Sequence, residues 1–271
     1  MLSKVLLTGT LTPSQLVFYR SLLGSLVLLP ILLWQDRPLL RISRRDLPFF
    51  FCMGVFGLAF TQYTYYAAIQ SLDVGVAILL QYLAPLWILL FEHFYYRVPL
   101  TPSKVIALAL ALLGCFMIST GSFSLNGLGF KGLTLGLAAG VCFAAYGLMT
   151  KQALKSHHAL TVLFYSLLLT ALFWGIIGLG SRPSLPGVGL SAIGMIGYVA
   201  IFGTVVPYLV YLYALRLLEA SRVGIISTLE PVFAAGIAWF YLGERLSILQ
   251  LWGGAGVILA ITILQSGKAR E

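Results

Sequence analysis

Charged side chains are scarce in this chain. Of its 271 residues only 9% are charged, with 17 lysines and arginines against 8 aspartates and glutamates, while 60% are hydrophobic. A soluble domain has about 25% charged residues, and it could not bury the apolar surface implied by a mean hydropathy of +0.98. The composition therefore excludes an ordinary water-soluble fold and predicts a polytopic membrane protein.

Cysteine, histidine and catalytic motifs are also sparse. The three cysteines, Cys52, Cys115 and Cys142, lie inside apolar runs without short spacings, which indicates neither a zinc site nor disulfides. The sequence has no H-E-x-x-H and no G-x-S-x-G motif, and His157 and His158 lie in a polar connection without a neighbouring carboxylate. We therefore expect no metal, no cofactor and no enzymatic activity. The net charge of +9 is spread singly between apolar stretches, so it does not predict a nucleic-acid partner.

Nine apolar segments are long enough to cross a bilayer, which takes about 20 helical residues. They stay apolar throughout instead of alternating in polarity, so they predict helices and not the strands of a barrel. The protein is therefore expected to be an all-α membrane protein that is embedded in the lipid bilayer. The predicted helices cover residues 14–34, 48–70, 74–95, 103–121, 131–153, 159–179, 188–213, 222–242 and 248–265.

The chain contains an internal repeat at an offset of 146 residues. Without a gap, this shift aligns Pro85 with Pro231 and the acidic residue Asp73 with Glu219. Several leucine and aromatic residues match at the same offset. Chance matches among apolar residues are frequent, whereas a proline pair and an acidic pair at one offset are harder to obtain by chance. We therefore expect two homologous repeats, residues 1–121 and 122–271.

The first repeat is expected to lack most of its first helix. The second repeat begins with the span near residue 131, and the counterpart of that span would begin upstream of Met1. Residues 1–10 would then be the last turns of this helix, which leaves nine full transmembrane helices. A native nine-helix protein with a short N-terminal tail is the alternative.

Basic residues predict the orientation in the membrane. Every second connection between helices is basic, while the intervening connections hold only Lys131, Arg182 and Arg245. By the positive-inside rule, the basic connections and the C-terminus are cytoplasmic in a multi-pass protein of the inner (plasma) membrane. Because five helices per repeat is an odd number, the two repeats must be inserted in opposite orientations. The basic set is Arg37, Arg41, Arg44, Arg45, Arg97, Lys104, Lys151, Lys155, Arg216, Arg222, Lys268 and Arg270.

Four short segments resemble motifs of a known transporter family. They are residues 16–20 (LVFYR), 83–86 (LAPL), 229–232 (LEPV) and 241–246 (YLGERL). With them, the chain resembles the drug/metabolite transporter superfamily, in particular its EamA-type members. The resemblance implies a ten-helix fold of two inverted five-helix repeats that carries small organic solutes, often outward, by alternating access. The departures are the shortened first helix and an RVPL segment at residues 97–100, which lacks the acidic residue of GERL.

Three prolines mark positions where helices are expected to break or bend. Pro85 and Pro231 occupy equivalent mid-span positions, and each leaves the carbonyl four residues earlier without its helical donor. Matched interruptions of this kind point to the midplane binding site of a transporter, and simple packing kinks are the alternative. Pro207 has Thr61 at the equivalent position and is expected to act as a hinge or kink.

Two charged residues lie inside apolar spans and have no charged counterpart in the other repeat. Arg20 is a candidate for holding a substrate carboxylate, and its alternative role is an anchor at the outer headgroups. Glu230 is a candidate for binding a proton or the substrate, and its alternative is a structural role in the interrupted helix. Helix geometry places the two about 9 Å apart along the membrane normal, which suits the ends of a small zwitterion.

Polar side chains at mid-span complete the expected site. The candidate substrate-binding residues are Tyr63, Gln81, Tyr82 and Tyr208. Tyrosines nearer the span ends are assigned to the membrane interface instead. Helical spacing also places Gln62 and Tyr66 on the face of Tyr63, although both stay outside this set.

Together these observations predict an integral membrane transporter that exports small organic metabolites such as amino acids or related compounds. Its partners would be the bilayer, the solute and, through Glu230, protons. A channel-like facilitator and an inactive truncated transporter subunit are the alternatives. No oligomeric state is predicted.

Overall fold

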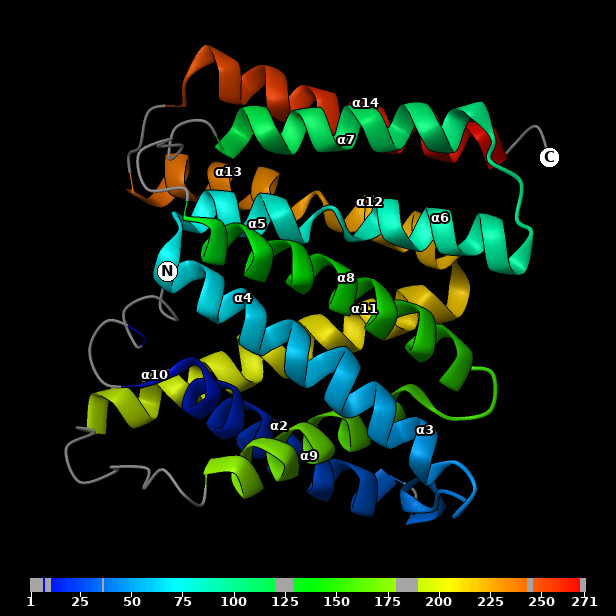
Figure 1. The fold of residues 1–271 in the computed structure, drawn as a ribbon, viewed down its shortest axis with the longest axis vertical. Helices are drawn as coiled ribbons and strands as arrows, with labels where there is room; N and C mark the ends of the chain where they lie inside the picture. The colour runs from blue at the N-terminus through cyan, green and yellow to red at the C-terminus, as the bar shows by residue number, and fades with distance from the viewer. Residues whose placement is uncertain are drawn as a thin grey trace.

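In the computed structural model, long helices lie side by side across the width of the molecule (Figure 1). The structure describes residues 7, 11–35, 37–119, 129–178, 190–242 and 246–268, and the regular structure within these ranges is entirely helical. Eight helices among them are long and apolar enough to cross a membrane. The prediction of an all-α, multi-pass membrane protein is therefore confirmed. Residues 1–10 apart from Leu7, the junction near residue 121 and residues 243–245 lie outside the described residues.

The helical elements follow one another through the chain with short connections. They are α2 (Pro13–Gln35), η1 (Arg37–Leu40), α3 (Leu47–Cys52), η2 (Met53–Ala59), α4 (Phe60–Ser71), α5 (Val74–Gln81), α6 (Ala84–Tyr96), α7 (Pro102–Ser119), α8 (Phe130–Ala153), α9 (Ala159–Gly178), α10 (Leu190–Ala200), η4 (Ile201–Val205), α11 (Val206–Leu217), α12 (Ala220–Ser227), α13 (Glu230–Leu242) and α14 (Ile248–Lys268). The elements η2 and η4 are π-helical, so they insert wider turns into the spans that contain them.

Most predicted spans agree with the observed helices to within two residues at each end. The predicted span 248–265 ends three residues before the end of α14, which continues to Lys268, and the predicted span 188–213 ends four residues early, because its helix continues to Leu217. The ammonium of Lys151 explains the extra turn, since it donates to the carbonyl oxygens of Leu215 and Leu218 at 2.5 and 2.7 Å. These carbonyls would otherwise lack partners at the helix end.

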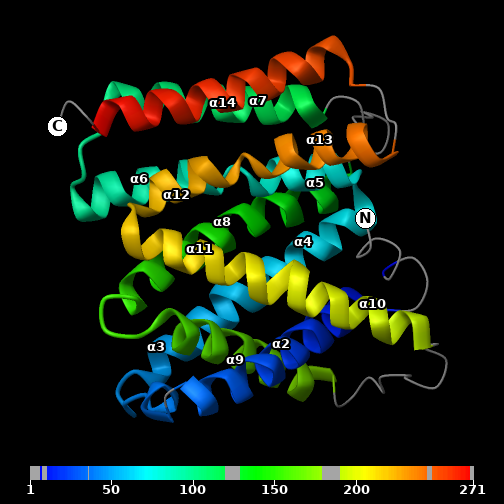
Figure 2. The same cartoon turned by 180° about the vertical axis from the view of Figure 1, so that it is seen from behind.

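Two spans are interrupted in the middle of the bundle. The first span is divided into α5 and α6, and the second is divided into α12 and α13. Figure 2 shows these two interrupted spans in one layer of the bundle. Pro85 and Pro231 are each the second residue of the helix that follows the interruption. A proline at the start of a helix loses no hydrogen bond, because the first N–H groups have no partner within the helix.

Helix α8 approaches the first interruption closely. A Cβ atom added to Gly140 would lie 2.8 Å from the carbonyl oxygen of Leu80, and one on Gly136 would lie 2.5 Å from the Leu80 side chain. Glycine at these positions therefore lets two backbones meet, as small residues do between membrane helices.

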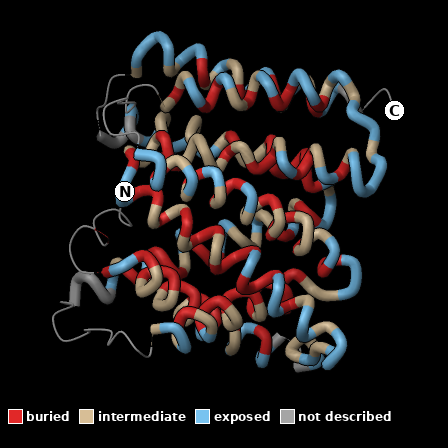
Figure 3. The backbone as a smooth tube through the Cα atoms, in the orientation of Figure 1, coloured by how far each residue is buried: buried red, intermediate tan, exposed pale blue. Residues whose placement is uncertain are grey.

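The outer helices pair across the two halves of the chain. Helices α7 and α14 lie together along one side of the bundle, and α2 and α9 lie together on the opposite side (Figures 1 and 2). Buried residues concentrate along the inward faces of the helices, as the red segments of Figure 3 show. Large apolar side chains such as Trp34, Phe94 and Leu217 are exposed on the outside, as expected of a surface that faces lipid.

Element boundaries recur at the offset found in the sequence. Helices α4 and α11 begin 146 residues apart and end 146 residues apart, and the same holds for α5 with α12 and for α6 with α13. A π-helical segment precedes both α4 and α11, and the two segments end 146 residues apart. The two halves of the chain therefore fold into corresponding elements around corresponding interruptions.

Candidate functional site

A buried arginine connects three elements in the interior of the bundle. Arg20, on α2, is only 6% exposed. Its Nε donates to Thr204 Oγ1 at 2.9 Å, its Nη2 donates to the carbonyl oxygen of Gly203 at 2.9 Å, and its Nη1 donates to the Tyr66 hydroxyl. The guanidinium also lies 5.4 Å from the centre of the Tyr66 ring, in the range of a cation–π contact.

Pro207 explains why a donor is needed at this point. It has no N–H group, so the carbonyl of Gly203, four residues earlier, lacks the usual helical donor. Arg20 supplies that donor from another helix. At the equivalent place in the first half, the carbonyl of Gly57 accepts from the hydroxyl of Thr61 at 2.6 Å.

The charge of Arg20 is not neutralised by the described part of the chain. Among the described residues, no aspartate or glutamate forms an ion pair with it. A guanidinium has five N–H groups, and the three hydrogen bonds described above use three of them. Burying an unpaired charge is costly, so the arrangement favours an anion beside Arg20.

Several polar groups in the interior of the bundle are buried without well-formed hydrogen bonds. Gln62, one turn before Tyr66 on α4, is 3% exposed, and neither its amide nitrogen nor its amide oxygen forms a hydrogen bond of good geometry. The hydroxyls of Tyr146 on α8 and Tyr211 on α11 are in the same condition. Tyr208 is the residue that connects the group, because it lies next to Gln62 and within electrostatic range of Arg20.

The two helix interruptions meet at a second polar contact. The hydroxyl of Tyr82, in the gap between α5 and α6, donates to Glu230 Oε2 at 3.0 Å, and Glu230 is the first residue of α13. Tyr82 is 9% exposed, whereas Glu230 is exposed. Tyr65 and Tyr208 both lie within electrostatic range of Arg20 and of Glu230, so the two charged residues belong to one region.

The remaining predicted site residues lie around this region in different ways. Tyr63 is half-buried and turns toward α9, with its ring 4.7 Å from that of Trp174. Gln81 is half-buried at the end of α5, and Pro85 is buried at the start of α6. Pro207 is exposed near the start of α11, and Pro231 is half-buried. Within the described residues, neither Tyr63 nor Gln81 forms a hydrogen bond with Arg20.

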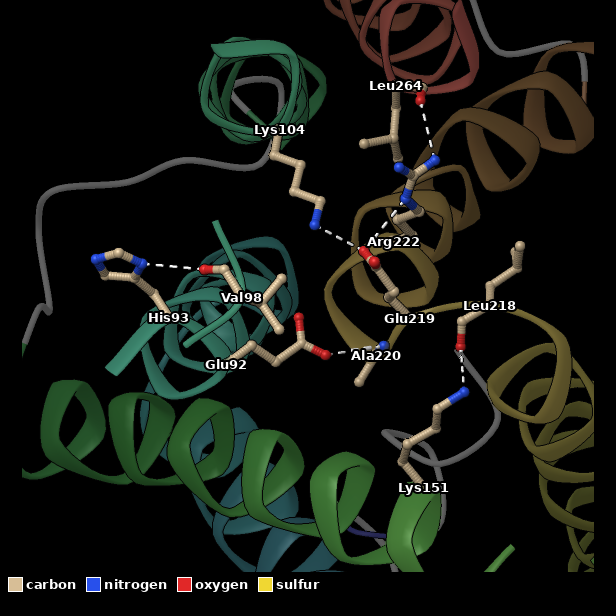
Figure 4. Close-up of polar contacts among 10 residues, drawn as sticks. All are labelled: Glu92, His93, Val98, Lys104, Lys151, Leu218, Glu219, Ala220, Arg222 and Leu264. Carbon is tan, nitrogen blue, oxygen red and sulfur yellow. Dashed lines mark hydrogen bonds and ion pairs between the residues drawn. The ribbon is translucent and has the colours of Figure 1, made fainter. Parts of the chain in front are cut away.

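One end of the bundle carries a network of charged groups, which we call the ionic end (Figure 4). Lys104 Nζ lies 2.7 Å from Glu219 Oε2, and Arg222 Nε donates to the same oxygen at 3.3 Å. Glu92 Oε1 accepts from the backbone N–H of Ala220, the first residue of α12, at 3.1 Å. These contacts join α6 and α7 to α12, so they connect elements from the two halves of the chain.

The network also sets the titration of Glu219. Burial raises the pKa of this carboxyl, but Lys104 and Arg222 lower it by more, so the pKa lies below its ordinary value of 4.5. Glu219 therefore adds stability that is fully present above about pH 4.5 and is lost as the pH falls through the lower folded-state value. Glu219 therefore stays charged at neutral pH.

The two partners of this ion pair should respond differently to substitution. Lys104 is only 4% exposed, and Glu219→Gln leaves its ammonium without a counter-ion. We expect this to lower the free energy of unfolding by about 2 kcal/mol, a value reduced for the solvent exposure of Glu219. Lys104→Met should cost less, because Glu219 is 45% exposed and keeps Arg222. The double variant with Lys104→Met and Glu219→Gln should therefore be more stable than Glu219→Gln alone. Thermal unfolding of the purified variants measures these differences in stability. The expectation would be contradicted if the two single variants lost equal stability and the double variant lost the sum of the two.

Sequence reasoning singled out Arg20 and Glu230, and it also selected Tyr82 and Tyr208, which lie beside them, but it did not find the partners Thr204 and Gly203 of Arg20. Thr204 and Gly203 carry no charge and no motif, although the proline at 207 signals a carbonyl in need of a donor. Helical spacing predicts that Gln62 and Tyr66 share a face with Tyr63, but it does not distinguish them from residues at the membrane interface. The ionic end was missed because its contacts join residues more than 100 positions apart, as in Lys104 with Glu219.

The geometry defines a class of protein: a multi-pass helical membrane protein whose two interrupted helices meet at a polar region inside the bundle. A sequence profile of the EamA-like transporter family matches residues 1–120 and 130–265. The chain belongs to this family, as its motifs predicted. The family consists of transporters.

Individual relatives support the same assignment. An uncharacterized transporter of Archaeoglobus fulgidus is 31% identical over 209 residues, which cover 74% of this chain and 70% of the relative. The threonine/homoserine exporter RhtA of Escherichia coli K12 is 29% identical over 259 residues, 93% of this chain and 83% of the exporter. A protein crystal structure that is 19% identical superposes with a TM-score of 0.81 over 99% of this chain and 94% of its own, which shows a shared fold.

Proposed function

We propose that this protein exports small zwitterionic metabolites of the amino-acid type. The observation that carries the proposal is the buried guanidinium of Arg20, which has no carboxylate partner among the described residues. A substrate carboxylate would supply the missing negative charge through the N–H groups that remain free. The similarity to exporters named for threonine and homoserine is consistent with such a substrate.

Transport by alternating access requires two units that move against each other, and we assign this role to the repeats 1–121 and 122–271. The matching element boundaries and the two ranges matched by the family profile support a duplicated fold. The alternation of basic connections supports opposite insertion of the repeats, with the C-terminus and the ionic end in the cytoplasm.

The ionic end then acts as the cytoplasmic gate. The pair Lys104 with Glu219 and the bond from Ala220 to Glu92 each connect one repeat to the other. Both contacts are formed in this structure, which supports assigning it to the state in which the proposed gate is closed. Loading from the cytoplasm requires them to separate while the central region stays assembled.

Glu230 is the proposed proton-binding residue. It receives a hydrogen bond from Tyr82 across the point where the two interrupted helices meet. Protonation removes the charge that this bond stabilises and therefore weakens the link between the repeats. Uptake of a proton at Glu230 would in this way be coupled to the relative movement of the interrupted helices.

Counterflow in proteoliposomes tests the proposed function. Vesicles that contain the purified protein and are preloaded with unlabelled L-threonine should take up labelled L-threonine faster than empty ones, and the uptake should saturate. A channel-like facilitator would give uptake that neither saturates nor accelerates with preloading. An inactive subunit would give no uptake above that of protein-free vesicles. Either of these results would contradict a carrier.

A further inference from the structure

The buried amide of Gln62 is the most conspicuous unsatisfied group in the described part of the chain. Neither of its polar atoms forms a hydrogen bond of good geometry although the residue is 3% exposed, and the hydroxyl of Tyr208 is the polar group beside it. A buried polar group without partners destabilises the folded state, so an isolated role in packing does not account for glutamine here. An apolar residue of the same size would fill this space at lower cost.

The surroundings of Gln62 place it within the proposed substrate region. Tyr66, which receives a bond from Arg20, follows one helical turn later on the same helix, about 6 Å away along its axis. Tyr208, on α11, lies next to Gln62 and within electrostatic range of Arg20. A molecule whose carboxylate is held by Arg20 can therefore reach Gln62 with a group only a few bonds away.

The chemistry of an amide limits what this group can be. The amide of Gln62 offers donors and an acceptor side by side, and the hydroxyl of Tyr208 can do both as well. A substrate group that both donates and accepts, such as a hydroxyl or a carboxamide, satisfies this pair fully. An ammonium group can only donate hydrogen bonds, and a methyl group can neither donate nor accept them. Each would therefore leave polar atoms of Gln62 or Tyr208 without a partner.

We infer that Gln62, assisted by Tyr208, is the specificity-determining residue that selects substrates with a short, neutral hydrogen-bonding side chain. This inference rests on the proposed function, because it assumes that Arg20 holds the carboxylate of the same substrate. The inference also explains how the protein would discriminate between similar substrates. An analogue with a methyl group in place of the hydroxyl leaves the buried amide of Gln62 unpaired.

The test compares matched substrates in the counterflow assay. L-threonine is paired with L-valine, and L-homoserine with L-norvaline, so that each pair differs by a hydroxyl against a methyl group. The wild-type protein should prefer the hydroxyl compound at least tenfold in kcat/KM. Gln62→Met, which keeps the length of the side chain but removes its amide, should bring both ratios to about one.

Further variants separate recognition from folding. Gln62→Asn should restore part of the preference, and Tyr208→Phe should weaken it while the ring contact with Tyr146 is kept. Gln62→Met should also raise the melting temperature of the substrate-free protein by roughly 2 to 4 °C, because an unsatisfied polar group is removed. Ser221→Ala is the matched control, since the Ser221 hydroxyl is equally buried and unpaired but lies at the ionic end. It should leave both substrate ratios unchanged.

The outcomes distinguish the inference from the proposed function. If the wild-type protein transports all four compounds and Gln62→Met changes their rates equally, the inference is wrong while the proposed function stands. If the wild-type protein transports none of them, the proposed function itself fails. Loss of the hydroxyl preference together with a higher melting temperature supports the inference.

Discussion

Replacing Arg20 with alanine is expected to reduce transport of carboxylate-bearing substrates by about 10- to 100-fold, while the matching amines that lack the carboxylate are much less affected. A hydrogen bond to a charged group contributes about 1.5 to 3 kcal/mol, and each 1.4 kcal/mol corresponds to a factor of ten. Counterflow of L-threonine and of 1-aminopropan-2-ol, its decarboxylated analogue, measures the difference. Equal losses for both compounds would show that Arg20 does not hold the carboxylate.

A structural role of Arg20 must be separated from this effect. The substitution also removes the donor to the carbonyl of Gly203, which we expect to destabilise the fold by about 1 to 3 kcal/mol. Pro207→Thr provides the control, because it copies Thr61 in the first half, whose hydroxyl donates to the carbonyl of Gly57. It also restores a backbone N–H at position 207.

In the background of Pro207→Thr, Arg20→Ala should unfold at a higher temperature than it does alone. Transport of carboxylate substrates should nevertheless stay low. Recovery of transport together with stability would indicate that Arg20 serves only the backbone of the π-helical segment.

The second large effect is expected at Glu230. Wild-type vesicles should accumulate substrate against its gradient when a pH gradient is imposed, about tenfold per pH unit if one proton is exchanged per substrate. Glu230→Gln cannot release a proton, so it should still allow counterflow but give no accumulation. Measured accumulation ratios at several imposed gradients test this directly.

Asp73→Asn is the control for the Glu230 experiment. Asp73 is also acidic but lies in the connection between α4 and α5, outside the interrupted helices. Its substitution should leave the accumulation ratio unchanged. Unaltered accumulation in Glu230→Gln would exclude this residue as the proton carrier. Glu219 is not a second candidate at neutral pH, because its pKa is held below 4.5 by Lys104 and Arg222.

Most of the fold follows from two features of the sequence. Apolar runs of about 20 residues leave few structures other than membrane helices, so the spans could be placed to within a few residues. The error at the end of α11 has a specific cause, because the side chain that caps its last carbonyls, Lys151, comes from another helix. Long-range capping of this kind has no local signal in the sequence.

The site was only partly predictable for the same reason. A charge in an apolar run is visible in the sequence, so Arg20 and Glu230 could be singled out. The choice between Gln62 and Tyr63 depended on which neighbouring position faces the interior. In the structure Gln62 faces the Arg20 region, whereas Tyr63 packs against Trp174 on α9. Spacing along one helix does not determine this, because it depends on how α4 is rotated against α8 and α9.

The most direct test of the account is a binding measurement on the purified protein. L-homoserine and 3-aminopropan-1-ol differ only in the carboxylate, so their affinities compare the same molecule with and without the group assigned to Arg20. We predict saturable binding of L-homoserine, at least tenfold weaker binding of the amine, and loss of this difference in Arg20→Ala with Pro207→Thr. Equal affinities of the two compounds for the wild-type protein would contradict a carboxylate site at the buried guanidinium.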